Sequence, residues 1–97
     1  MENNEKKDAY RKKIEAQIEE WDAQIDLLKA RAKKAGAEMQ LKLERQIEEL
    51  KARREDVRAH LAELHKAGDD AWHRVRDGLD KALGELRSAW DKIKERF

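Results

Sequence analysis

Apolar residues recur at alternating intervals of four and three over the first two thirds of the chain, and no proline interrupts them. Residues at these intervals lie on one face of a helix, so the pattern predicts a coiled-coil seam. The first run consists of Ile14, Ile18, Trp21, Ile25, Leu28, Ala32, Ala35 and Met39. After a four-residue slip in phase, which locally unwinds a supercoil without ending the helix, the second run consists of Leu43, Ile47, Leu50, Arg54, Val57, Leu61 and Leu64.

Gly36 is the residue of this stretch at which the helix could be interrupted. A lone glycine costs only about 1 kcal/mol relative to alanine in a helix interior, and no capping residue stands nearby to restart a helix. The sequence therefore predicts one continuous helix from about residue 5 to 67. The alternative is a turn near residue 36, which would give an up-down-up three-helix bundle and bury more of the seam within one chain.

A helix boundary is predicted at residues 66–70, where a glycine follows a basic last turn and two aspartates can cap a new helix. The segment of about 70–97 is then amphipathic. Its predicted docking face consists of Trp72, Val75, Leu79, Leu83, Leu86, Trp90, Ile93 and Phe97. We expect this face to fold back on the long helix, so that residues 1–97 form a single all-α, coiled-coil domain.

The charge pattern argues against several classes of partner and location. Charged residues make up 46% of the chain, but the periodic apolar residues favour helix over disorder. Acidic and basic residues balance in each third of the chain, so we expect no binding to nucleic acid. The chain has no cysteine, no secretory-type apolar segment near its start and no apolar run of about 18 residues, so a cytoplasmic location is expected.

Candidate catalytic and metal-binding residues are few. Ser88 has no histidine within one helical turn that could activate it as a nucleophile. His60 and His65 are five residues apart and do not share a helix face, and Glu63 follows His60 in the reverse of the Glu-x-x-His order of di-iron bundles. We therefore expect no enzymatic activity, no metal site and no cofactor.

The final segment allows a second interpretation. Trp72 and Trp90 are separated by five helical turns and share a face, and basic residues flank that face. Such a helix can lie on a membrane surface with its tryptophans at the interface. As many acidic residues flank the same face, which weakens attraction to anionic lipid, so membrane binding is the alternative rather than the first expectation.

Three segments resemble the small bacterial coiled-coil stress-response proteins. They are IEAQIEEWDAQID at 14–26, QIEELKARRE at 46–55, and the DAW and SAW tripeptides that contain Trp72 and Trp90. The resemblance covers nearly the whole chain. It implies a helical protein with a stress-linked role and no established catalytic residues.

These observations lead to one functional expectation. A long helix with a continuous apolar stripe is only partly covered by a partner about half its length, and an uncovered apolar stripe is an interaction site. We expect a non-enzymatic helical module that forms a homo-oligomer or binds another helical protein, and the resemblance implies a stress-linked role.

Overall fold

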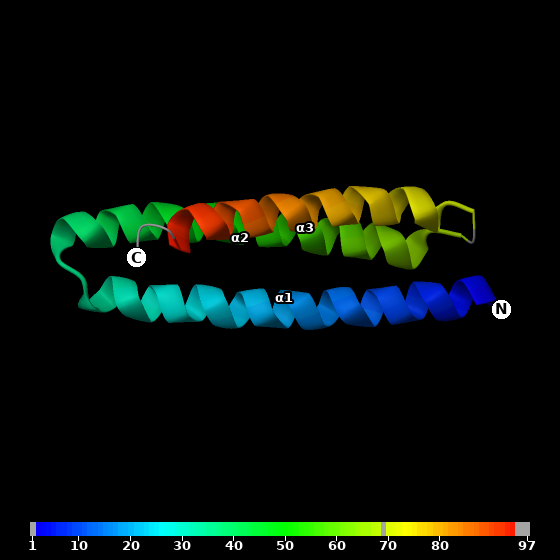
Figure 1. Ribbon diagram of the computed structural model, residues 1–97, viewed down its shortest axis with the longest axis horizontal. Coiled ribbons are helices and arrows are strands. Elements are labelled where there is room, and N and C mark those ends of the chain that lie inside the picture. Colours follow the sequence, from blue (N-terminus) through cyan, green and yellow to red (C-terminus); the bar gives the residue numbers. More distant parts are fainter. Residues whose placement is uncertain (1, 69, 95–97) are drawn as a thin grey trace.

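The computed structural model describes residues 2–68 and 70–94, with side chains described from residue 5 onward. Three helices follow one another along the chain: α1 (Glu2–Lys34), α2 (Ala37–Lys66) and α3 (Trp72–Lys94). They run up, down and up along a molecule with principal extents of 54 × 20 × 17 Å (Figure 1). The all-α prediction is therefore confirmed, in the three-helix arrangement that the sequence analysis kept as its alternative.

The predicted continuous helix over residues 5–67 is wrong, because α1 ends at Lys34 and α2 begins at Ala37. Gly36 is the N-cap of α2 and has an extended backbone, with φ −65° and ψ 162°. The turn allows the two halves of the seam to bury their apolar residues against each other. Burial of a single leucine or isoleucine side chain is worth about 1.5–3 kcal/mol. The several such side chains buried between α1 and α2 therefore outweigh a helix-propensity difference of about 1 kcal/mol at Gly36.

The second predicted boundary lies where the structure has its second connection. The backbone N–H of Ala67 donates hydrogen bonds to the carbonyls of Glu63 and Leu64, and the chain then leaves the helix in an extended conformation. The last helix begins at Trp72 rather than at about residue 70. The predicted end at residue 97 lies outside the described residues.

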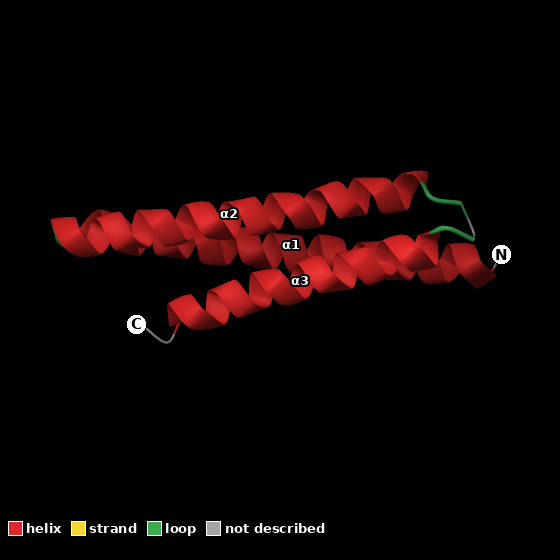
Figure 2. Cartoon of the chain, turned by 90° about the horizontal axis from the view of Figure 1, so that it is seen from above, coloured by secondary structure: helices red, strands yellow, loops and turns green. Residues whose placement is uncertain are grey.

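Helix α2 is the central element of the bundle. Most of the close backbone approaches join α2 to α3 and α2 to α1, and in Figure 2 α1 lies behind α2 and α3. The helices differ in length, so α3 ends well before the turn between α1 and α2 (Figure 1). Trp90, four residues before the end of α3, contacts Trp21, and α1 continues beyond that contact to Lys34. One end of the α1–α2 hairpin therefore extends past α3.

Candidate interaction surface

Most of the predicted seam forms the core of this bundle. The buried members are Ile14, Ile18, Ile25, Leu28, Leu43, Ile47, Leu50, Val57, Leu61 and Leu64. Trp21 is partly buried against this core, and Met39 is exposed. The seam is thus largely satisfied inside one chain, which removes the reason for which a homo-oligomer was expected along its whole length.

The predicted docking face of the last segment also lies in the core. Trp72, Leu79, Leu86 and Ile93 are buried, and Val75, Leu83 and Trp90 pack partly buried against the same cluster. Phe97 lies outside the described residues. The apolar face that the membrane interpretation requires is therefore occupied by α1 and α2, and lipid could reach it only if α3 left the bundle.

Polar contacts fix the register of the three helices. The Asp22 carboxylate accepts hydrogen bonds from Arg54 Nη1 at 2.7 Å and from Arg58 Nη2 at 3.0 Å, which joins α1 to α2. The contact between Arg53 Nη1 and Glu85 Oε2, at 2.9 Å, joins α2 to α3. Arg54 occupies a seam position in the sequence pattern, and the structure shows that it links α2 to α1.

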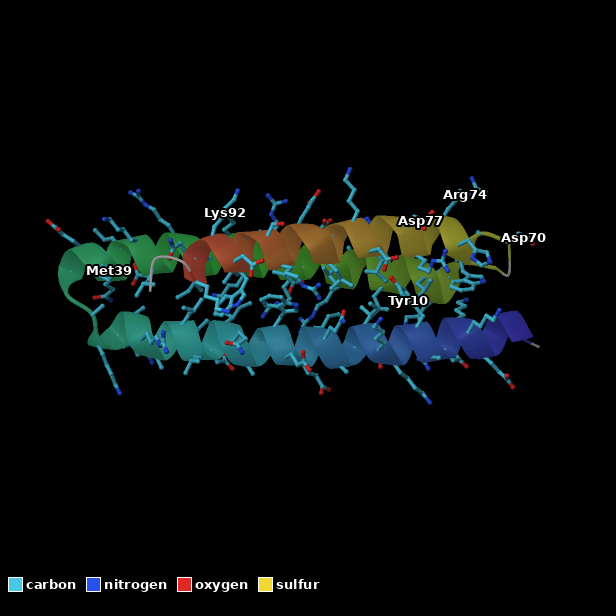
Figure 3. The ribbon with its side chains drawn as sticks, in the orientation of Figure 1. Tyr10, Met39, Asp70, Arg74, Asp77 and Lys92 are labelled. Atoms are coloured by element: carbon cyan, nitrogen blue, oxygen red, sulfur yellow. The ribbon has the colours of Figure 1, made fainter. Side chains whose placement is uncertain are left out.

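Tyr10 links α1 to α3. Its hydroxyl donates a hydrogen bond to the Asp80 carboxylate and makes a longer contact, at 3.4 Å, with the backbone carbonyl of Arg76. Figure 3 shows Tyr10 on the side of α1 that faces the other helices. Burial, followed by this hydrogen bond, raises the pKa of Tyr10 above its ordinary value of 10.0.

The end of the hairpin beyond α3 exposes apolar side chains. Leu27, Met39 and Leu41 are 50%, 47% and 59% exposed, and they are the large hydrophobic residues that stand out as exposed in the described part of the chain. Met39 belongs to the seam but lies beside the α1–α2 turn, past the end of α3 (Figure 3). We call residues 27–44 the hairpin end. Met39 is exposed because α3 ends before it, whereas Leu27 borders the last turns of α3 beside Trp90 and Lys94.

A hollow of about 450 Å³ opens between α1 and α2 near this end. Ala32 and Ile47 provide its apolar lining, and the described residues that surround it come from α1 and α2 alone. The polar lining residues are Lys29, Lys33, Gln40, Glu44, Glu48 and Lys51. We call this the hairpin hollow.

The walls of the hairpin hollow carry opposite charges. Lys29 and Lys33 stand on the α1 wall, and Glu44 and Glu48 stand on the α2 wall. These four residues do not stand out in the sequence, because charged residues make up 46% of the chain. Their signal in the sequence is the pairing of like charges at i,i+4, which is unfavourable within an isolated helix.

The described residues show neither a metal-binding cluster nor a membrane-spanning helix. Within the described residues, no group of three or more metal-ligating side chains could hold a metal ion. None of the described helices combines the length and apolarity needed to cross a membrane. No family model, curated protein or solved structure matches the chain. The resemblance to bacterial stress-response proteins therefore stays a prediction.

Proposed function

We propose that this protein is a non-enzymatic helical module that associates with other helical chains, its own copies first, through the hairpin end. One observation carries the proposal: Met39 and Leu41, in the first turns of α2, and Leu27, on α1 beside the end of α3, are exposed in a molecule whose other large apolar side chains are mostly packed. Exposed apolar residues that gather in one region are typical of protein-interaction sites.

The shape of the hairpin end supports a helical partner. Two helices continue side by side past the end of α3, so the position that a third helix occupies elsewhere in the bundle is not filled by α3 there (Figure 1). A helix from another chain can pack at this position by the same rules that hold α3 on α2. Such packing would cover Met39, whose place in the seam otherwise predicts burial.

The proposal is tested by making the hairpin end polar. We expect the unaltered chain to show a concentration-dependent increase in mass by sedimentation velocity between micromolar and millimolar protein. The triple variant Leu27→Gln, Met39→Gln and Leu41→Gln should stay monomeric, because association loses the burial of three apolar side chains.

A matched control separates association from folding. Glu20 is exposed on α1 outside the hairpin end, so Glu20→Gln should leave the sedimentation profile unchanged. Circular dichroism should show the same helicity for all of these proteins. An unaltered chain that stays monomeric up to millimolar concentration would overturn the proposal for its own copies.

A stress-linked role, which the resemblance implies, is part of this proposal. The corresponding experiment compares the growth of cells with and without the intact hairpin end under heat, acid and oxidative stress. Equal growth in all conditions would remove the stress-linked part and leave the association intact.

A further inference from the structure

We infer that the partner at the hairpin end is a second copy of this chain, related by a two-fold axis parallel to the helices, with α1 of each copy on α2 of the other. This inference rests on the proposed function, since it specifies the partner, and it places the contact at the hairpin hollow, on a different face of α1 from Leu27. The observation behind it is the charge pattern of the two walls of the hairpin hollow.

The register of α1 and α2 places opposite charges level with each other. Asp22 of α1 contacts both Arg54 and Arg58 of α2, and the two helices are antiparallel. Seven residues closer to the turn on each helix, Lys29 is level with residues 47–51, which include Glu48. By the same reasoning, Lys33 is level with Glu44.

A third level has the reverse polarity. Asp26 of α1 precedes Lys29 by one turn and is level with Lys51 of α2. Toward the turn, α1 therefore presents Asp26, Lys29 and Lys33 in order. At the same levels, α2 presents Lys51, Glu48 and Glu44. This order specifies a register as well as an orientation, because a shift by one turn would bring like charges together.

A two-fold axis parallel to the helices leaves the height of every residue unchanged. It places the α1 wall of one copy against the α2 wall of the other, at the levels described above. Lys29 and Lys33 then face Glu48 and Glu44 of the second copy, and the same contacts occur twice because the interface is self-complementary. An unrelated helix would need to carry both charge patterns at the correct spacing.

The charges of the walls are not satisfied across the hollow within one chain. Among the ion pairs of the described residues, Lys29 contacts Asp26 at 3.9 Å and Lys51 contacts Glu48 at 3.4 Å, both within their own helix. None of the described ion pairs joins the two walls. Each wall also keeps a like-charge pair at i,i+4, which is unfavourable in an isolated helix and is offset when opposite charges approach.

The interface would also bury apolar surface. The exposed Leu41 lies on α2 at the same end, where it adds apolar surface beside the charged walls.

Reciprocal charge reversal tests this arrangement. In the variant Lys29→Glu/Lys33→Glu, both walls become acidic, and in the variant Glu44→Lys/Glu48→Lys, both become basic. We expect each variant alone to self-associate at least about tenfold more weakly than the unaltered chain at low salt. An equimolar mixture should recover association as a heterodimer, because each acidic wall then meets a basic wall.

The measurement is sedimentation equilibrium combined with energy transfer between differently labelled variants. The control variant Lys6→Glu/Lys12→Glu reverses two exposed charges of α1 that lie outside the hairpin end and do not line the hollow, and it should associate as the unaltered chain does. Circular dichroism checks that every variant keeps its helices.

The outcomes separate this inference from the proposed function. Association of the unaltered chain that neither reversal weakens, or a mixture that fails to recover it, would overturn the inference while leaving association through the hairpin end intact. An unaltered chain that remains monomeric would overturn both.

Discussion

The imidazole ring of His60 occupies the space into which a side chain at residue 78 would extend. A Cβ atom at Gly78 would lie 3.2 Å from Cδ2 and 3.5 Å from Nε2 of His60. The ring is held in place by a contact of 2.8 Å between its Nδ1 and the carbonyl of Asp56. Gly78 therefore permits the close packing of α3 on α2, and its low helix propensity has a structural reason.

Gly84 lies in the same helix but has no such neighbour, since nothing stands within 4 Å of a Cβ added there. We expect Gly84→Ala to raise the free energy of unfolding by about 1 kcal/mol, because alanine favours helix by that amount. Gly78→Ala should gain less or lose stability, because the His60 ring must move. Urea denaturation followed by circular dichroism measures both, and equal gains would contradict the assigned role of Gly78.

Trp21 and Trp90 meet edge to face, with ring centroids 5.8 Å apart and planes inclined at 76°. Aromatic pairs in this geometry contribute about 0.5–1.5 kcal/mol beyond their burial. We expect a double-mutant cycle with Trp21→Leu and Trp90→Leu to show a coupling free energy in this range. The pair Trp21→Leu and Trp72→Leu is the matched control, and it should show smaller coupling because no ring contact joins those residues in the described structure.

The Tyr10 hydroxyl should contribute to stability in a manner that depends on pH. Tyr10→Phe removes its hydrogen bond to Asp80 and should lower the free energy of unfolding by about 1 kcal/mol at neutral pH. The pKa of Tyr10 is raised in the folded protein, so the folded state holds this proton more tightly than the unfolded state. The contribution is complete below the unfolded pKa of about 10 and is lost as the pH rises above it.

Denaturation of both proteins between pH 7 and 11 checks this expectation. The stability difference between the unaltered chain and Tyr10→Phe should stay constant up to about pH 10 and then shrink. The comparison cancels the titration of lysines, which the two proteins share. A difference that grows with alkalinity would show that the sign is wrong.

The turn between α1 and α2 can be strengthened at Gly36. This residue is the N-cap of α2 but offers no side chain to the free backbone N–H groups, and its backbone is extended, which any residue can adopt. Gly36→Asp should raise the free energy of unfolding by about 0.5–1 kcal/mol through capping and the helix dipole. Gly36→Ala is the matched variant without a cap, and thermal unfolding that ranks alanine at or above aspartate would refute the explanation.

The sequence predicted the composition of the core better than its connectivity. The apolar spacing identifies Ile25, Leu50 and Leu86 as buried, because periodicity depends only on which residues share a helix face. Local propensity favours a continuous helix through Gly36. The break is favoured only when the burial in a three-helix bundle is compared with the burial in a continuous long helix. Exposure of Met39 could not be foreseen, since it depends on where α3 ends relative to α2.

The candidate site was predictable only in part. The seam predicts helical self-association, but the structure buries most of the seam inside one chain, so we place the proposed contact surface at the hairpin end. The charges of Lys29 and Glu48 gain meaning only when the register of α1 and α2 is known, and that register depends on contacts such as the one between Asp22 and Arg54. Sequence periodicity does not determine the register of two antiparallel helices.

The up-down-up path has a mechanical consequence. With three described helices, the chain enters the bundle at one end, at Glu2, and leaves α3 toward the other, at Lys94 (Figure 1). Domains fused before and after the bundle would therefore be held apart by the length of α3, which is about 35 Å for 23 residues at 1.5 Å per residue, instead of emerging next to each other. The fold can serve as a rigid spacer in engineered fusions, a property that hairpins with an even number of helices lack.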